Sequence, residues 1–514
     1  MMHSKAQLAD ILKLIDFGSS VAETDQLLES ARVETSVYTE LLNDTVDLIP
    51  GTKGSGKSAL YRIFVDFLPD HLLELRKVVV AHGIQQHGNE IFDAYNDSFI
   101  QMSESEFVDF WCIYLISLAN EQFIKGPRYS EHLQSCSHEI DAFHRACRAA
   151  MIPEFNTPKP LDDVLGWVLA VLNKCRPKPK LTFRPSNGSG EYGVTLWGEQ
   201  EAQQDKKKTE NDKARLPQYA HVIKDSLENV LKKAKLNLWL MVDRLDEIFP
   251  RRSPLETCAL RGLLRTLRIF ESKEIRVKVF LRDDILNQIV SGGKGFTALT
   301  HVTSRKADTL CWSEGQILTM IVRRLYAKEK VRNFLDIDSE RLVASPEYQE
   351  NAFYKVFPST VAHGPKQSNT LRWIYHHTTD GAGVVTPRDV IELLTRAKQR
   401  QQDDFSMDPY SKSDFIIGPS AIKYGLAEMS KGKRTTFLQA EFPHLFKHIQ
   451  KFIGGKTQYS EVALRRILGR DWESIVDDLV SIGLVKKEIS PDGQTNIKFP
   501  FLYREGLELT QGRA

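Results

Sequence analysis

The sequence predicts an α/β fold with a parallel sheet core, a helical lid and a C-terminal winged helix. Three observations support the core. A short β-prone run at residues 46–49 leads into a glycine-rich loop and then a helix. An apolar run at residues 236–242, typical of a strand covered on both faces, ends at Asp243. A third apolar run, residues 275–281, follows a helical pattern at residues 255–270 and completes a strand–helix–strand unit.

The glycine-rich loop matches the phosphate-binding pattern G-x-x-x-x-G-K-[ST] in full. Glycines let backbone N–H groups approach phosphate oxygens, and the N-terminus of the following helix favours an anion. We expect Lys57 to reach the β- and γ-phosphates and Ser58 to offer its hydroxyl to Mg²⁺. The alternative is a glycine-rich turn that binds nothing. The expected nucleotide-binding residues are Gly51, Thr52, Lys53, Gly54, Ser55, Gly56, Lys57, Ser58 and Ala59.

An acidic turn follows the strand that ends at Asp243. A nucleotide site needs a carboxylate at the end of a neighbouring strand to hold Mg²⁺, and Asp243 is the candidate. Asp246 or Glu247 would then polarise the attacking water as general base. Three acids within five positions are also compatible with a solvated turn. The glycine-rich loop upstream favours the catalytic interpretation.

Two arginines are candidate phosphate contacts. Arg282 ends the run at residues 275–281, and ligands of such sheets bind at the carboxyl ends of strands, so Arg282 is a candidate γ-phosphate sensor. The alternative is an ion pair with Asp283 or Asp284. Arg388 lies at a predicted helix start capped by Thr386, where the helix dipole opposes a cation and a nucleotide phosphate would explain it. The alternative is a pair with a nearby carboxylate. Residues 77–82 are expected to form a further strand.

Composition sets broad limits on the class of protein. The 514 residues carry 69 Lys and Arg against 67 Asp and Glu, a formal net charge of +2, which excludes a histone-like polycation. The length suits about three domains. The cysteines form no C-x-x-C pair, and no apolar run reaches the ~18 residues of a membrane-spanning helix. We therefore expect a reduced, soluble, cytoplasmic protein that does not contact a membrane.

One cluster of cysteines and histidines needs weighing as a metal site. Cys136, His138, His144 and Cys147 lie close together, with His132 just before them. Zinc requires four converging nitrogen or sulfur ligands. The pattern here predicts one helix, which cannot aim four side chains at one point. Ordinary helix packing is therefore the favoured interpretation, and zinc the alternative.

The expected domains follow from the position of these motifs. They are an ATPase core at residues 1–335 with an insertion at 126–216, a helical lid at 336–435 and a winged helix at 436–514. Ahead of the insertion, Ser103 and Glu106 form a capping box, and the aromatic stripe that follows is predicted core. The insertion carries a basic connector at residues 174–180 and a polar run at 199–213. A solvated loop is favoured there over a nucleic-acid or partner surface.

The C-terminal pattern is three helices followed by a hairpin. The helices are expected at residues 441–452, 460–468 and 471–482, and the strands at 484–489 and 495–499. The third helix, which would enter a DNA groove, carries four acids and no Lys or Arg. Phosphate neutralisation dominates DNA affinity, so these acids would repel DNA. A packing or protein-contact module is therefore favoured over a DNA reader.

The loop and the acidic turn together resemble a known family. They are similar to the signal-transduction ATPases called STAND, to the KAP-type ATPases and, more distantly, to the AAA+ origin-recognition group. The nearest resemblance is to the bacterial FunZ-like P-loop ATPases. It rests on residues 17–28, 47–63, 240–249 and 310–325, with a later echo at 386–394. Arg244 departs from the pattern, because the NACHT members of STAND have glycine there.

The resemblance implies a function and further site residues. It implies an AAA+-like lid and winged helix, with Arg388 as the second sensor. Arg323 and Arg324 are candidates for an arginine finger that reaches a neighbouring subunit. The expected function is an Mg²⁺-dependent ATPase switch that self-associates or binds a partner protein, plausibly in bacterial antiviral or conflict responses. The alternatives are a nucleic-acid-associated, origin-recognition-like ATPase and, more weakly, a P-loop kinase. No guanine-reading motif occurs, which favours ATP over GTP.

Overall fold

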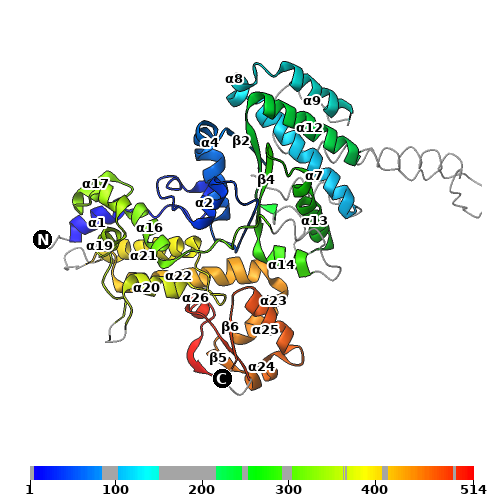
Figure 1. Cartoon of the computed structure of the whole chain (residues 1–514). Coiled ribbons are helices and arrows are strands. Elements are labelled where there is room, and N and C mark those ends of the chain that lie inside the picture. Colours follow the sequence, from blue (N-terminus) through cyan, green and yellow to red (C-terminus); the bar gives the residue numbers. More distant parts are fainter. Residues whose placement is uncertain are drawn as a thin grey trace, which may run out of the picture. The chain divides into compact units, whose positions relative to one another are not determined.

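The chain forms two compact units in the computed structural model (Figure 1). Unit 1 comprises Met1–Asn43, Gly51–Ile63 and Asp308–Ala514, and unit 2 comprises Asp44–Pro50 and Phe64–Ala307. The predicted domain boundaries at residues 335 and 435 stay predictions. The structure describes residues 5–83, 102–149, 216–245, 253–291, 304–362, 364, 367–407, 415–489 and 494–514.

Unit 2 is built around a sheet of four strands in the order β1-β4-β3-β2. β3 pairs in parallel with both β2 and β4, with Gly83 opposite Val242 and Val242 opposite Val279. Each predicted strand is present within about two residues of its expected bounds, because each apolar run is buried almost throughout. The strands are β1 (Leu48–Gly51), β2 (Val78–Gly83), β3 (Asn237–Val242) and β4 (Ile275–Arg282).

Helices complete the core of unit 2. The predicted capping box of Ser103 and Glu106 starts α7, and the aromatic stripe behind it is buried as expected. α7 packs against α13, where the Trp111 indole N–H donates to the Ala259 carbonyl at 2.9 Å. The helices are α4 (Pro69–Arg76), α7 (Glu104–Ala119), η3 (Asn120–Ile124), η4 (Pro127–Tyr129), α8 (Ser130–Leu133), α9 (Ser137–Ala149), α12 (Leu216–Ala234), α13 (Pro254–Ile269) and α14 (Asp283–Ser291).

The cysteine and histidine cluster does not lie on one helix, so that prediction was wrong. α8 ends at Leu133 and α9 begins only at Ser137. Cys136 and Cys147 are buried in the apolar core, while His144 Nε2 lies 3.2 Å from the Asn120 amide oxygen. Within the described ranges, no three His, Cys, Asp or Glu side chains are grouped to hold a metal. The polar run at 199–213 and the connector at 174–180 lie outside the described residues.

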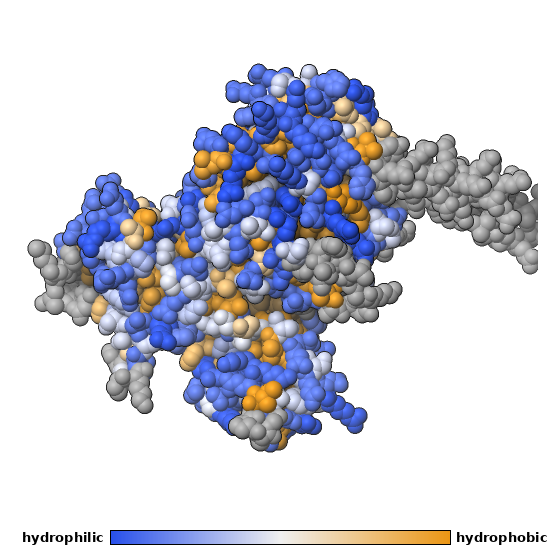
Figure 2. Space-filling view, viewed as in Figure 1, coloured by the Kyte–Doolittle hydropathy of each residue, from blue (hydrophilic) through white to orange (hydrophobic). Residues whose placement is uncertain are grey.

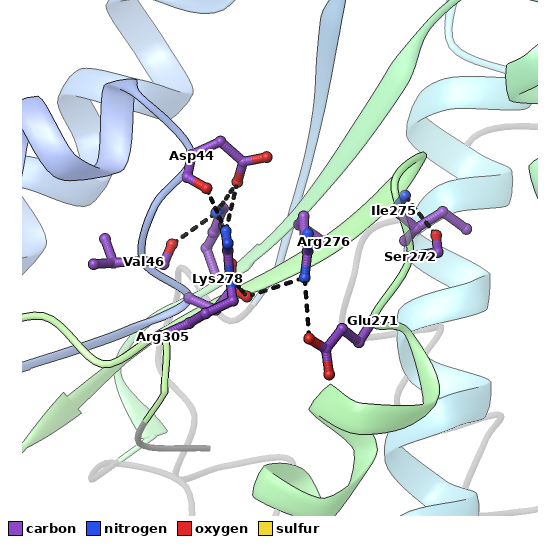
Figure 3. Close-up of polar contacts among 9 residues, drawn as sticks. Asp44, Val46, Glu271, Ser272, Ile275, Arg276, Lys278 and Arg305 are labelled. Atoms are coloured by element: carbon purple, nitrogen blue, oxygen red, sulfur yellow. Dashed lines mark hydrogen bonds and ion pairs between the residues drawn. The ribbon is translucent and has the colours of Figure 1, made fainter. Parts of the chain in front are cut away.

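A buried cluster of charges fastens the start of β1 to β4 (Figure 3). Lys278, on β4, is fully buried, and its ammonium donates to Asp44 Oδ1, to the Val46 carbonyl at 2.7 Å and to Asp47 Oδ1 at 2.7 Å. Arg305 donates to Asp47 Oδ2 at 2.6 Å. Three donors on the ammonium therefore meet three acceptors, as a buried charge requires.

Unit 1 has its own core, in which α21 and α22 pack closely. A Cβ on Gly425 of α22 would lie 2.3 Å from the Leu393 carbonyl of α21, so the two backbones touch there. The helices are α1 (Lys5–Leu14), η1 (Ala22–Thr24), α2 (Ser36–Leu42), α3 (Lys57–Arg62), α16 (Glu314–Leu325), α17 (Glu329–Phe334), α18 (Ser339–Ala344), α19 (Pro346–Phe353), α20 (Thr370–Thr378), α21 (Pro387–Met407), α22 (Pro419–Lys433), η6 (Arg434–Gln439), α23 (Pro443–Ile449), η7 (Gln450–Phe452) and α26 (Phe501–Arg504). η2 (Ile63–Phe67) runs from unit 1 into unit 2.

The C-terminal elements contain the predicted helices and hairpin, together with two strands that were not predicted. α24 (Glu461–Leu468) and α25 (Trp472–Ser481) precede the antiparallel pair β6 (Lys486–Ile489) and β7 (Thr495–Lys498). β5 (Lys456–Ser460) and β8 (Thr510–Arg513) extend this pair to a sheet in the order β6-β7-β5-β8. Both added strands are short and polar, so no apolar alternation marked them.

The visible surface of the molecule is mostly hydrophilic (Figure 2). In unit 1, exposed apolar side chains include Val343, Val462 and Ile489. Throughout the described part of the chain, each helix is too short or too polar to span a lipid bilayer.

Candidate nucleotide-binding site

The glycine-rich loop joins β1 to α3, as its sequence predicts. β1 ends at Gly51 and α3 begins at Lys57. Gly54 has φ +85° and Gly56 has φ +100°, a left-handed backbone that side chains with a Cβ rarely adopt. The left-handed backbone at these two positions sets the shape of the loop and explains why glycine stands at both of them.

Polar groups inside the loop are arranged around its own backbone. The Lys57 ammonium donates to the carbonyls of Gly51 at 2.7 Å and of Thr52 at 2.9 Å. The hydroxyls of Thr52 and Ser55 are buried and have no hydrogen-bond partner among the protein atoms described. Ser58 and Ala59 are half-buried in the first turn of α3. A buried hydroxyl without a partner costs free energy, and a polar ligand that bonded these two hydroxyls would remove that cost.

Residues distant in sequence pack against this loop within unit 1. The Trp312 indole N–H donates to the Ser55 carbonyl at 2.7 Å. A Cβ on Gly54 would lie 3.2 Å from Arg388 Cβ and 3.3 Å from Thr386 Oγ1. The structure thus brings Arg388, proposed from its position at a helix start, beside the loop. Trp312 was not predicted as a site residue, although it opens the stretch at residues 310–325 that carries the resemblance.

The start of α21 has the predicted cap. Thr386 Oγ1 accepts from the Asp389 backbone N–H at 3.3 Å and donates to Asp389 Oδ2 at 2.8 Å. Lys433 of α22 pairs with the same carboxylate at 2.5 Å. The bond from the Asp389 N–H satisfies one of the free donors in the first turn of the helix. Arg388 also donates to the Ser20 carbonyl at 3.3 Å, which ties the lead-in at residues 17–28 to α21.

Arg324 does not have the position of an arginine finger. It is buried, pairs with Asp25 at 2.6 Å and donates to the Phe17 carbonyl at 2.6 Å. A finger must reach into another subunit, whereas this guanidinium is used to hold the lead-in inside its own chain. Arg323 likewise donates to the Arg32 carbonyl. The arginine-finger hypothesis was wrong for Arg324, because its guanidinium is buried against Asp25. Neither residues 17–28 nor residues 310–325 contain a sequence signal that predicts this pairing.

The carboxyl edge of the sheet in unit 2 carries the other predicted residues. Asp243 follows β3 and is buried, at 4% exposure. Arg282 ends β4 and makes a two-fold contact with Asp284, through Nε at 3.0 Å and through an NH₂ group at 2.9 Å. The ion-pair alternative is therefore formed, and the γ-phosphate sensor stays a prediction. Asp246 and Glu247 lie outside the described residues.

Two further features of this edge were not predicted. Arg244 has φ +60°, so the position where the NACHT pattern has glycine adopts the backbone that glycine favours. His82, near the end of β2, is clamped by Gln122, which bonds its backbone N–H at 2.9 Å and its carbonyl at 2.7 Å. Burial lowers the pKa of His82, against the opposing effect of Asp66. A lone histidine in an apolar strand gave no signal in the sequence.

The comparisons with known proteins give a distant likeness among solved structures. No protein-family model matches this chain, and neither does any curated protein. Among solved structures, the chain is similar to one described as "Structure of the Aeropyrum Pernix ORC2 protein (ADPNP-ADP complexes)", with a TM-score of 0.42 and 12% identity over 92% of this chain and 93% of that chain. A TM-score of this size does not transfer function or site residues. The FunZ-like and STAND relationships remain resemblances of the quoted residues.

Proposed function

We propose that this chain binds ATP with Mg²⁺ at residues 51–59 and hydrolyses it. One observation supports this above the others: the full phosphate-binding pattern folds as a loop between a strand and a helix, with Gly54 and Gly56 left-handed and the Thr52 and Ser55 hydroxyls buried without a partner among the described residues. Phosphate oxygens are acceptors that such hydroxyls and the loop N–H groups would bind.

The proposed roles follow from residue type and position. The Lys57 ammonium would exchange its bonds to the Gly51 and Thr52 carbonyls for bonds to the β- and γ-phosphates. Ser58 and Asp243 would hold Mg²⁺, which would neutralise charge on the phosphates. Asp246 or Glu247 would take the proton of the attacking water. Arg388, whose Cβ lies beside Gly54, supports a role as second sensor. Arg282 would have to share its guanidinium between Asp284 and a phosphate.

We propose further that the ATPase acts as a switch. Arg388 belongs to α21, which packs against α22, so a phosphate that draws this arginine would bias the helices after residue 386. Nucleotide-dependent self-association or partner binding is the expected output. A part in bacterial antiviral or conflict responses remains an expectation from the resemblance alone.

A nucleic-acid-associated ATPase is the second candidate, favoured by the helices and hairpin at residues 461–498. The charges there weaken it. Lys487 pairs with Asp477 at 2.7 Å, and Arg465 pairs with Glu461 at 2.8 Å, so two cations that could contact a nucleic-acid backbone are neutralised within the module. Phosphate binding by these cations would first have to break those pairs.

The decisive experiment is an ATPase assay of the purified chain, with and without DNA and RNA, read beside the mass of the particle. Lys57→Ala should abolish nucleotide binding, while Glu247→Gln or Asp246→Asn should retain binding and lose turnover. Lys13→Ala, on an exposed side chain of α1, is the matched control and should behave as wild type. Turnover that survives all three site changes would refute the site.

The same preparations separate the two outputs. For the switch, the mass of the hydrolysis-deficient variant should change when ATP is added; a monomer under every nucleotide condition would count against it. For the nucleic-acid candidate, duplex affinity should fall steeply as salt rises. Absence of binding at low salt would remove that candidate.

A further inference from the structure

We infer that the Glu441 carboxylate competes with bound phosphates for Lys53 of the glycine-rich loop. Nucleotide binding would then change the structure around Glu441. The inference rests on the proposed ATP site and concerns its regulation. Glu441 forms an ion pair with Lys53, the third residue of the loop, and both belong to unit 1. The structure thus links the loop directly to the segment that leads into the C-terminal elements.

Burial of the Glu441 carboxylate costs free energy unless a cation lies beside it. Its side chain is only 4% exposed, whereas that of Lys53 is 32% exposed. Burial disfavours the negative charge, so the pair with Lys53 stabilises Glu441 where it lies.

Phosphates at residues 51–59 would compete for the same lysine. Lys53 lies between Gly51 and the left-handed Gly54, so its backbone is part of the proposed cradle. A nucleotide would add negative charge beside Glu441 and draw Lys53 away from it. The buried carboxylate would then be left without that lysine, which favours a rearrangement around residues 434–446. The next residue, Phe442, is buried against the Phe437 ring, so the disturbance would reach the apolar core.

Glu441→Gln and Lys53→Met test this in opposite directions. Glu441→Gln keeps the shape and removes the competing charge, so Mg-ATP should bind roughly five- to fifty-fold more tightly. Lys53→Met removes a cation from the loop, so Mg-ATP should bind more weakly. Without nucleotide, both variants should speed amide hydrogen exchange at residues 434–446, because both break the same pair. Glu428→Gln, on α22 in an exposed pair with Lys431, is the matched control and should change neither measurement.

The outcomes distinguish this inference from the ATP site itself. If wild type binds Mg-ATP, Glu441→Gln binds within twofold of it or more weakly, and ATP leaves exchange at residues 434–446 unchanged, the competitor role is overturned and the ATP site stands. If wild type and Glu441→Gln both fail to bind, like Lys57→Ala, the ATP site is refuted and the regulation falls with it. Opposite affinity changes with shared loss of protection would establish the competition, because a merely structural contact would shift both affinities the same way.

Discussion

Two groups of buried polar side chains, one in each unit, differ in whether the described protein atoms satisfy them. In unit 2, the fully buried Lys278 ammonium has an acceptor for each of its donors (Figure 3). In unit 1, the Thr52 and Ser55 hydroxyls are buried in the loop without a partner among the described protein atoms. Satisfied buried charges hold a structure together, whereas unsatisfied groups cost about 1–3 kcal/mol each until something binds them. The satisfied cluster therefore serves the fold, whereas the two hydroxyls could gain bonds from a ligand.

The largest expected effect comes from breaking the satisfied cluster. Lys278→Met would leave Asp44 and Asp47 half-buried, with Arg305 and Arg276 as the remaining cations paired with them among the described residues, so the free energy of unfolding should fall by about 3–5 kcal/mol. Urea titration followed by circular dichroism measures this. Lys273→Met, exposed in the turn before β4, should change it by less than about 0.5 kcal/mol. A similarly small change for Lys278→Met would mean that the cluster is not structural.

The next effect concerns a half-buried titratable group in unit 1, His377. The His377 ring lies between the rings of Trp373 and Phe501, at centroid distances of 3.8 and 4.1 Å. Burial lowers the pKa of His377 to about 4; Arg504 and His376 lower it further, and the bond to the Trp373 carbonyl opposes them.

The sign of the resulting pH dependence follows from that shift. Because the folded pKa of His377 lies below the ordinary value near 6.5, the fold holds the neutral ring, and its stability is present above about pH 6.5 and lost as pH falls toward 4. His377→Phe keeps an aromatic ring. Between pH 7 and 4.5, this variant should lose about 2 kcal/mol less of its free energy of unfolding than the wild type loses. Urea midpoints across that range provide the measurement; identical slopes for variant and wild type would contradict it.

A smaller effect on stability, of opposite sign at Thr52 and Thr386, compares a hydroxyl without a described partner with a hydroxyl that is bonded. Thr52→Val removes a buried hydroxyl without a described partner, so ligand-free stability should rise by about 1 kcal/mol while stabilisation by Mg-ATP decreases. Thr386→Val is the matched control, because its hydroxyl makes two bonds to Asp389 and its loss should cost about 1 kcal/mol. Thermal unfolding with and without Mg-ATP measures both. Loss of stability in both variants would show that the Thr52 hydroxyl already makes a favourable contact in the ligand-free protein.

The smallest expected effect concerns Arg244 at the carboxyl edge of β3. Its φ of +60° costs about 1 kcal/mol for a residue with a Cβ, and the added chain entropy of glycine offsets about 0.5–1 kcal/mol. Arg244→Gly should therefore change the free energy of unfolding by less than about 0.5 kcal/mol. A loss above 2 kcal/mol would show that contacts of the arginine side chain, not its backbone, hold this turn.

Much of the fold could be predicted because its signals are local. The four strands of unit 2 are apolar runs, and the capping residues Ser103 and Thr386 precede their helices directly. The predictions that were wrong or missing depend on packing. The break between α8 and α9 lies in a stretch with a continuous helical pattern, and β5 and β8 are polar segments that become strands only by pairing with neighbours.

The sequence by itself determined the glycine-rich loop, the strands and the capped start of α21, because each needs only neighbouring residues. The tertiary structure alone decided what meets the loop. Trp312, Arg388 and Glu441 reach it from distant parts of the chain. It also decided that Arg324 is an internal anchor rather than a finger. A charged side chain has no intrinsic partner, and the burial of the segments that carry it determines which opposite charge or carbonyl it meets.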